Sequence, residues 1–393
     1  MNLLCIAILH FALAQQSASS PVADAQQPPV APPAMCEVIV LGMIHGGHRN
    51  SELWGLDEVR ETIRRIQPDV VLCEIPPNLW PAASKLWREK KVIEDARIKR
   101  FPEYTDVVLP LMDELKFELE PCAAWTSAMA SARGKVIAEF EKAGKEGEVG
   151  QTDWSAYRQA EAWVAKWAAP HALADADPMV IHSPQYDHVT KGTLLPYDHW
   201  LNSRIGVGGW TQINEAHYAL IDQAIKRHPG KRILITFGAG HKYWFLEQLR
   251  WRSDVKLLDA RSFLPGSEQA LTEVQRVKDE VFKFAECTWR CFYDEGNAYM
   301  HPAMNRISNS MSPRDSMLVI NGLRRGPQGS TFLDRQWLSP VTVAPIKEGE
   351  WKVSFTISRA LQAPNEAGKA SAILIADQSR PGGFRWTEIN WPR

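Results

Sequence analysis

Three short apolar runs along this chain each end close to a residue with a chemically active side chain. They are Val38 to Leu41, followed by Gly42-Met-Ile-His45; Val70 to Cys73, followed by Glu74; and Ile233 to Phe237, followed by Gly238-Ala-Gly-His241. Continuous apolar runs, as opposed to alternating ones, are typical of strands that are covered on both faces. In an open α/β sheet the carboxyl ends of parallel strands meet at one edge. We therefore expect His45, Glu74 and His241 to lie in one cleft.

Helical spacing of apolar residues between these runs completes two α/β units. Residues 36–79 form the first unit, with a helix predicted over Glu52 to Ile66 between its strands. Residues 210–265 form the second. Its predicted elements are a helix from Asn214 to His228, a strand from Arg232 to Phe237, a helix from Tyr243 to Trp251 and a strand from Val255 to Leu258. The pattern predicts an α/β catalytic-like domain over 36–265, with a central, mostly parallel sheet and helices on both faces.

The rest of the chain changes in character. Residues 80–209 read as a helical insertion, and residues 266–393 as a helix from about Glu268 to Cys291 followed by a small antiparallel β-rich module. The insertion's predicted helices are Trp87 to Arg100, Val107 to Phe117, Ala130 to Ala143 and Trp154 to Trp167, and its stretch from Pro170 to Gly209 reads as irregular. The module's clearest predicted strands are Trp351 to Ser358 and Ala370 to Asp377.

Two imidazoles and a carboxylate support two kinds of hydrolytic chemistry. In one, His45, His241 and Glu74 bind a divalent ion such as Mn, Co, Fe or Zn, which activates a water molecule. In the other, which needs no metal, His45 or Glu74 is the general base and His241 stabilises or protonates the leaving group. A serine nucleophile is not indicated, since the chain has no Gly-x-Ser-x-Gly motif.

Several further residues are candidates for supporting roles. The glycines Gly42, Gly238 and Gly240 permit sharp turns and close backbone approach to a substrate or ion. His48 is either an extra ligand or a solvated loop residue. A polar stretch that could cover the site contains His182, Asp187, His188, Asp198 and His199.

The two Gly-x-x-His elements, Ser51 shortly after the first of them, and Pro68-Asp-Val-Val-Leu-Cys-Glu74 together resemble the TraB/PrgY/GumN/Tiki group, which is related to erythromycin-esterase and ChaN-like proteins. The resemblance covers about Glu37 to Pro77 and Trp210 to Leu264. It implies an α/β fold with the histidines and the glutamate at the active centre, and in some members a metal-dependent peptidase or hydrolase. Many members carry an acidic-Arg-Asn or Arg-Asp element before the last strand, of which this chain keeps Asn214 as an auxiliary candidate.

The function expected from these features is an exported hydrolase that cleaves a peptide or ester bond in a small-molecule or peptide substrate. One alternative is a haem- or iron-complex-binding protein of ChaN-like type, with His45, His241 or a nearby tyrosine as axial ligand. Another is a non-catalytic exported binding protein that uses its C-terminal module as the partner surface.

Composition and the N-terminus limit the setting. The net charge of −1 gives no field to attract nucleic acid or an anionic membrane. Residues 1–14 resemble a signal peptide with an Ala12-Leu-Ala14 cleavage site, and residues 15–35 a disordered linker, so we expect a periplasmic or secreted protein with no transmembrane span in the mature chain.

Tryptophan and cysteine residues give weaker indications. The chain has 16 Trp, of which those in the middle are expected to pack in a core more readily than to line a cleft: Trp80, Trp87, Trp154, Trp163 and Trp167. Cys287 and Cys291 could form half of a metal site, but packing or a disulfide elsewhere is the preferred interpretation.

Overall fold

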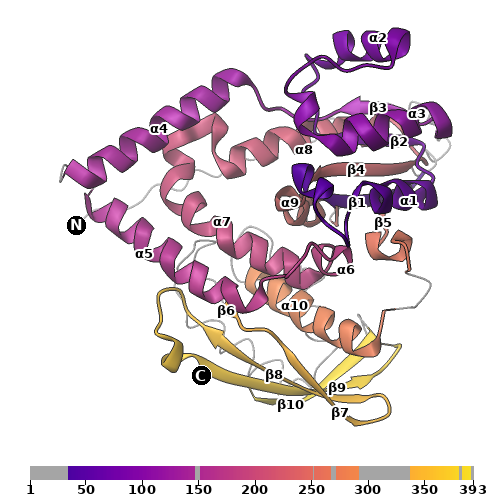
Figure 1. Cartoon of the computed structure of the whole chain (residues 1–393). Coiled ribbons are helices and arrows are strands. Elements are labelled where there is room, and N and C mark those ends of the chain that lie inside the picture. The colour runs from indigo at the N-terminus through magenta and orange to yellow at the C-terminus, as the bar shows by residue number, and fades with distance from the viewer. Residues whose placement is uncertain are drawn as a thin grey trace, which may run out of the picture. The chain divides into compact units, whose positions relative to one another are not determined.

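Five parallel strands form the central sheet, in the order β3-β2-β4-β1-β5 (Figure 1). They are β1 (Cys36–Met43), β2 (Val70–Cys73), β3 (Glu118–Pro121), β4 (Arg232–Gly238) and β5 (Val255–Leu257). The computed structural model describes residues 34–146, 151–250, 252–266, 271–291, 337–379 and 383–390. The predicted signal peptide and nearly all of the predicted linker lie outside these residues. The expected α/β fold with a parallel sheet is confirmed.

Helices cover both faces of this sheet, as the continuous apolar runs predicted. Alternate residues of β1 point to opposite sides: Ile39 and Leu41 join one core cluster, whereas Val38 and Val40 join another. The first cluster is covered by α1 (Leu56–Ile66), by the π-helical segment η3 (Glu103–Val108) and by α3 (Leu109–Leu115). The second is covered by α8 (Trp210–Arg227) and α9 (Ala239–Leu249).

Strand β4 lies between β1 and β2, although it follows them by more than 150 residues in the chain. The register pairs Met43 of β1 with Gly238 of β4, and Cys73 of β2 with Thr236 of β4. The ends of all three strands therefore meet at the same edge of the sheet.

The helices α1 and α9 have starts that differ from the predicted ones. Helix α1 begins at Leu56 and not at Glu52, because the Ser51 hydroxyl accepts a hydrogen bond from the Trp54 amide and Gly55 occupies the N-cap in an extended conformation. Helix α9 begins directly after Gly238, so His241 lies in its first turn. The helix was expected to begin at Tyr243, with His241 before it, and this start was wrong.

The insertion also departs from its predicted pattern. Helix α2 covers Trp80–Lys90 and ends at Lys91 in the left-handed region, so the helix expected from Trp87 to Arg100 is wrong. A short 3-10 segment, η2 (Ile98–Arg100), follows, and at its start the Asp95 carboxylate accepts hydrogen bonds from the amides of Arg97 and Ile98. Strand β3 was missed; only four residues long, it is an edge strand of the central sheet.

The stretch expected to be irregular is largely helical. Helix α7 (Pro184–Ile205) follows the short helix α6 (Pro178–Ile181). Its start is fixed by Ser183, whose hydroxyl accepts a hydrogen bond from the Tyr186 amide, and by proline at the first helical position. Tertiary packing outweighs the poor helix formers inside α7: a side chain on Gly192 would collide with the rings of Trp167 and Trp337.

Helices α4 (Ser127–Glu146) and α5 (Gln151–Ala168) complete the insertion. Among the tryptophans expected to serve packing, Trp163 and Trp167 pack against Ala160, Val164, Leu195 and Trp337, and Trp154 joins a second small cluster around Phe140. Trp154, Trp163 and Trp167 are partly buried and pack against these clusters, in line with the packing role preferred from the sequence. Cys36, Cys73 and Cys122 are free and buried, whereas the side chains of Cys287 and Cys291 lie outside the described residues.

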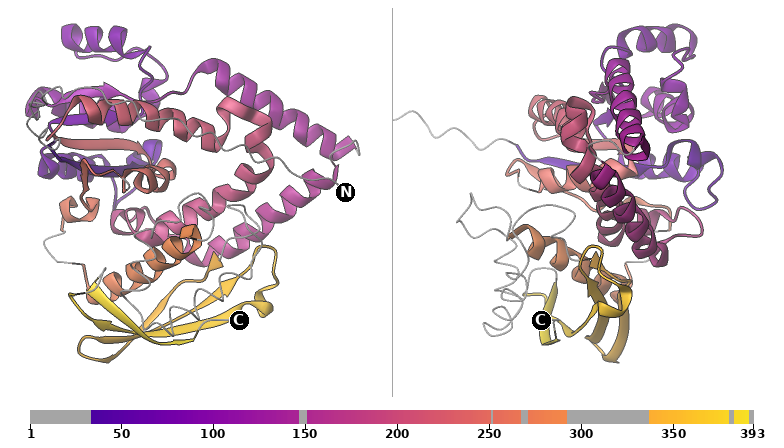
Figure 2. Two further views of the ribbon diagram at one scale, coloured as in Figure 1. Left: turned by 180° about the vertical axis from the view of Figure 1, so that it is seen from behind. Right: turned by 90° about the vertical axis from the view of Figure 1, so that its left-hand side faces the viewer.

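The C-terminal residues form the expected antiparallel module. Its strands are β6 (Trp337–Leu338), β7 (Thr342–Lys347), β8 (Glu350–Ser358), β9 (Gly368–Ala376) and β10 (Phe384–Asn390). Helix α10 (Glu273–Cys291) lies against one face of this sheet, where Val281 and Phe284 pack with residues such as Trp386 (Figure 2). Among the described helices, none combines the length and the apolar character needed to cross a bilayer.

Candidate active site at the carboxyl edge of the sheet

The strand order brings the three predicted site residues together. Glu74 follows β2, and its Oε2 atom lies 3.7 Å from Nε2 of His45, which follows β1. Its Oε1 atom lies 4.0 Å from Nε2 of His241, in the first turn of α9. The carboxylate therefore lies within reach of two imidazole nitrogens, at separations too long for direct hydrogen bonds.

His45 is held by its backbone and by a buried carboxylate. Its φ of 52° is in the left-handed region, an unfavourable conformation for a residue with a side chain and one that clusters at functional sites. Its Nδ1–H donates to Oε1 of Glu103 over 2.7 Å, and its ring lies 4.7 Å from that of Phe101. Burial opposes protonation, but the hydrogen bond to Glu103 and the charge of Glu74 raise the pKa of His45 above its usual value.

His241 is oriented by Asn214 and by an aromatic stack. The Asn214 side chain donates from Nδ2 to the Trp210 carbonyl, over 2.8 Å, so its Oδ1 accepts the hydrogen bond from Nδ1–H of His241 over 2.7 Å. This leaves Nε2 of His241 as an unprotonated atom that faces Glu74. The indole of Trp210 stacks on the imidazole at 4.7 Å, and burial together with the neighbouring His217 holds the pKa of His241 well below its usual value.

Glu74 is fixed by the end of β4. The Gly238 amide donates to its Oε2 over 2.7 Å, while the Glu74 amide donates to the Tyr104 hydroxyl, which in turn donates to the Thr236 carbonyl. Burial raises the pKa of Glu74, although the charge of His45 and the Gly238 hydrogen bond partly oppose this. A carboxylate with an increased proton affinity is better suited to accept a proton from water near neutral pH.

The three predicted glycines have different roles. A Cβ atom on Gly238 would lie 2.7 Å from Nε2 of His45, so glycine is required for this imidazole to hold its position. A Cβ on Gly42 would lie 3.0 Å from that of Ala239, which shows how closely the end of β1 packs against α9. Gly240 has ordinary space, with Trp210 nearest at 3.7 Å.

His48 and His182 serve the backbone around the site. Nε2 of His48 accepts from the Ile44 amide and its Nδ1 donates to the Trp54 carbonyl, so this residue stabilises the loop after β1 and has no ring nitrogen left for a ligand. His182 likewise accepts from the Gly42 amide and donates to the Pro178 carbonyl. Burial and the charge of Lys242 lower the pKa of His182 to about 3.

The remaining candidates of the polar stretch lie on helix α7 and do not form a covering loop. Asp187 pairs with Lys242 of α9, His188 packs against Trp167 and Phe282, and Asp198 accepts a hydrogen bond from Thr211. His199 is exposed beside the ring of Trp200. Asp187, His188 and Asp198 thus serve contacts between α7 and neighbouring helices.

A cavity of about 290 Å³ adjoins the site. Glu74 and His241 line it, whereas His45 contacts Glu74 from outside this lining. The other polar and aromatic residues of its wall were not predicted from the sequence: Arg97, Arg100, Phe101, Trp125, Arg133, Tyr197, Trp210 and His217. Most come from the insertion, where no motif distinguishes them from surface or core residues.

The donor set around Glu74 suits a divalent ion in its chemistry. Each imidazole has Nε2 facing Glu74 and its Nδ1–H bonded to a second partner, Glu103 or Asn214, which is the usual arrangement around metal-binding histidines. Within the described residues, however, only Glu118, Glu120 and His228 bring three such ligand atoms within 4.8 Å of one another. Binding of one ion by His45, Glu74 and His241 would require the side chains to move closer.

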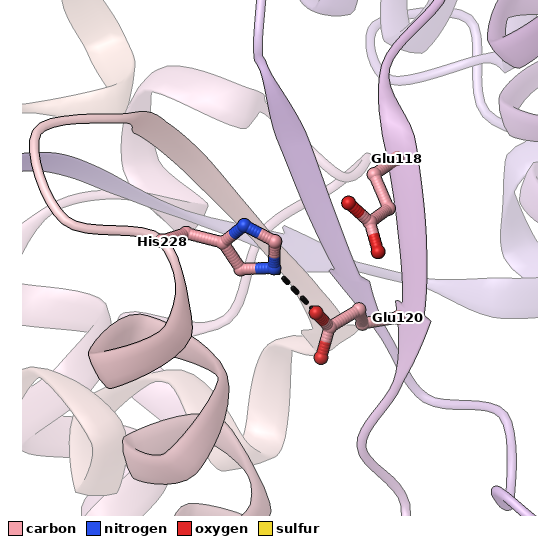
Figure 3. Close-up of side chains that lie close together, drawn as sticks. All are labelled: Glu118, Glu120 and His228. Atoms are coloured by element: carbon pink, nitrogen blue, oxygen red, sulfur yellow. Dashed lines mark hydrogen bonds and ion pairs between the residues drawn. The ribbon is translucent and has the colours of Figure 1, made fainter.

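The group of Glu118, Glu120 and His228 is a second possible metal-binding triad (Figure 3). Both glutamates project from one face of β3 toward His228, which follows α8. Glu118 is the first residue of β3 and His228 precedes β4, so the triad lies toward the amino ends of the strands, away from Glu74. Burial opposes ionisation of Glu120, but hydrogen bonds from Arg227 and His228 hold its pKa below its usual value. Its charge is thus already compensated by protein groups.

Comparisons with the profiles of known protein families, with curated protein sequences and with solved structures give no significant match to this chain.

Proposed function

We propose that this chain is a hydrolase that cleaves a peptide or ester bond in the cavity beside Glu74 and His241. The observation that supports this most strongly is the position of the Glu74 carboxylate between two imidazole Nε2 atoms, 3.7 and 4.0 Å away, each oriented through its Nδ1 atom by a separate partner. Acid–base or metal-assisted hydrolysis is expected to use such an arrangement, in which two oriented imidazoles flank a carboxylate at the edge of a cavity.

The residues divide the proton transfers by their surroundings. Glu74, with its raised pKa, accepts a proton from the attacking water. His45 carries the extra proton more readily than His241, because two carboxylates surround the first and burial disfavours charge on the second. From the sequence, His241 was expected to protonate the leaving group. The electrostatics favour His45 for this role, and His241 positions water or substrate through Nε2.

A divalent ion is compatible with the same residues. His45, Glu74 and His241 would hold it, and such an ion lowers the pKa of a bound water molecule and polarises a carbonyl group. Glu103 and Asn214 would then fix the two imidazoles as ligands.

The test is a screen of the full chain against chromogenic esters and short peptides, followed by variants of the site. The substitutions E74Q, H45A and H241A should each lower the rate on the substrate found by about a hundredfold or more, as loss of a general base or ligand does. The double variant E74Q/H241A should be little worse than either single variant if the residues act as a unit.

Matched controls are E348Q and H199A, which change exposed residues of the same types. Full activity of a correctly folded E74Q variant would contradict the proposal. Metal analysis of the purified chain, and the rate after chelation, decide between the two hydrolytic routes: a rate that survives complete metal removal leaves only the metal-free one.

A further inference from the structure

We infer that the cavity beside Glu74 recognises a substrate by a negatively charged group, carboxylate or phosphate, attached close to an aromatic or apolar part. This inference rests on the proposed hydrolase function, because it treats the cavity as the place where the substrate binds. It names the substrate class that the sequence left open.

The charges that line the cavity are strongly unequal. Three guanidinium groups line it, from Arg97, Arg100 and Arg133, and among the described residues that line it Glu74 alone carries a carboxylate. In the described part of the chain, none of the three arginines forms an ion pair with an aspartate or glutamate. By contrast, Arg64 and Arg232 each form an ion pair with a glutamate elsewhere in this chain.

Two of these arginines are held in place by neutral groups. Nη2 of Arg97 donates to the Trp125 carbonyl over 3.0 Å. Nε of Arg133 donates to the Tyr197 hydroxyl over 2.8 Å, and its guanidinium lies 5.1 Å from the centre of the Tyr197 ring. Neutral partners orient the guanidinium groups and leave their charge available, so an anion would meet donors that are already positioned.

The rest of the wall is apolar and aromatic. Phe101, Trp125 and Trp210 contribute rings, and Ile98 and Ile213 contribute aliphatic groups. A cavity of about 290 Å³ accommodates a small molecule or one or two residues of a peptide. Rings beside arginines suit a ligand whose anionic group is close to an apolar part, and the anion would anchor that ligand with its scissile bond toward Glu74.

The test measures binding to the full chain by calorimetry with three small probes of similar shape: hippurate, its neutral amide N-benzoylglycinamide, and phenyl phosphate. Hippurate or phenyl phosphate should bind at least about tenfold more tightly than the amide, a difference that one charge-assisted hydrogen bond can supply. The two anions distinguish a carboxylate site from a phosphate site. Equal affinity for charged and neutral probes would overturn the inference.

Variants locate the binding. The substitutions R97Q and R100Q should each weaken binding of the anionic probe by about three- to tenfold, whereas K99Q should not, because Lys99 is exposed on the same segment and does not line the cavity. Arg133 also packs against Tyr197, so R133K, which keeps the charge, serves as its folding control beside R133Q. A K99Q effect as large as that of R100Q would show a general effect of surface charge and would overturn the inference.

Repeating the titrations in E74Q separates the two hypotheses. Arginine-dependent binding of the anion in E74Q, together with loss of hydrolysis, supports both. Arginine-dependent binding with hydrolysis unaffected by E74Q contradicts the proposed function and leaves the anion site standing as a binding site. Hydrolysis that depends on Glu74 without preference for the charged probe contradicts the inference alone.

Discussion

Gly238 offers the sharpest test of the site, because one methyl group is expected to disable it without unfolding the protein. In the G238A variant the new Cβ would lie 2.7 Å from Nε2 of His45, where ordinary contacts begin at 3.4 Å. The backbone of Gly238, at φ −48° and ψ 135°, is one that alanine adopts without strain. The main relief available is therefore movement of the imidazole by about 0.7 Å.

Moving the imidazole disturbs the contacts that hold His45 in place. Its ring is fixed at Nδ1 by the 2.7 Å hydrogen bond to Glu103 and faces Glu74 through Nε2 at 3.7 Å. A shift of the ring therefore weakens the hydrogen bond to Glu103, changes the distance to Glu74, or does both. A misplacement of about 1 Å can lower the rate of an enzyme by about a hundredfold, so we expect kcat of G238A to fall by about ten- to a hundredfold. Stability should change little, since alanine gains about 0.4–1 kcal/mol through the unfolded state, and this offsets part of the cost of displacing His45.

The assay compares kcat, KM and thermal midpoint of the wild type, G238A and G240A on the substrate identified by the screen. Gly240 belongs to the same motif, but its Cβ would meet Trp210 at 3.7 Å, an ordinary contact. We expect G240A to keep its rate within about twofold and to gain up to about 1 kcal/mol of stability from better helix propensity. A G238A variant with full kcat would refute the argument that His45 must hold its observed position.

Three further predictions come from the structure and one from the N-terminal sequence. E103Q should lower kcat by about tenfold or more, because it removes the charge that orients His45. It should not lower the thermal midpoint, because Oε2 of the buried Glu103 carboxylate has no hydrogen-bond partner within the described structure. The free energy of unfolding should fall as the pH decreases from about 6.5 toward 3, by at most about 1.4 kcal/mol per pH unit from His182. The reason is that His182 is protonated in the unfolded chain, whereas burial lowers its folded-state pKa to about 3. Denaturant titration of the H182Q variant across that pH range should show a flatter profile. W337A should lose about 3–5 kcal/mol in denaturant unfolding, because this fully buried indole packs with Trp163 and Trp167, whereas an unchanged midpoint would show that this cluster contributes little. If residues 1–14 are a signal peptide, mass spectrometry of the chain after expression in a secreting host should show cleavage after Ala14, and an intact Met1 would contradict this prediction.

The local patterns in the sequence were sufficient for the class of fold. Buried strands of a parallel sheet must be apolar on both faces, so β1, β2 and β4 appear as continuous apolar runs and were located to within one or two residues. Strand β8, with one face on α10, alternates in burial and was recognised from period-two spacing. These elements could be predicted because the environment of each is uniform along its length.

Strand order could not be predicted in the same way. Nothing in the residues of β4 indicates that it pairs with both β1 and β2, since any of these strands could occupy a central position. The order depends on which helices pack on each face, a property of the whole domain. The meeting of His45, Glu74 and His241 was therefore a deduction from the shared edge of parallel strands, and its close geometry follows only from β4 lying in the middle.

The groups that give the site its electrostatic character were beyond the reach of motif reasoning. Glu103 begins a π-helical segment after Pro102, in the insertion, and it is completely buried although its residue type usually faces solvent. Its burial is tolerated because His45 donates to it, and His45 adopts its left-handed backbone conformation directly after β1. The hydrogen bond between His45 and Glu103 helps to offset both the burial of the carboxylate and the strained backbone of His45. Neither feature is visible in a local sequence pattern. The arginines of the cavity belong to the same insertion. The parallel sheet thus supplies the predictable catalytic candidates, whereas the irregular segments of the insertion decide how those residues are charged and which ligand can reach them.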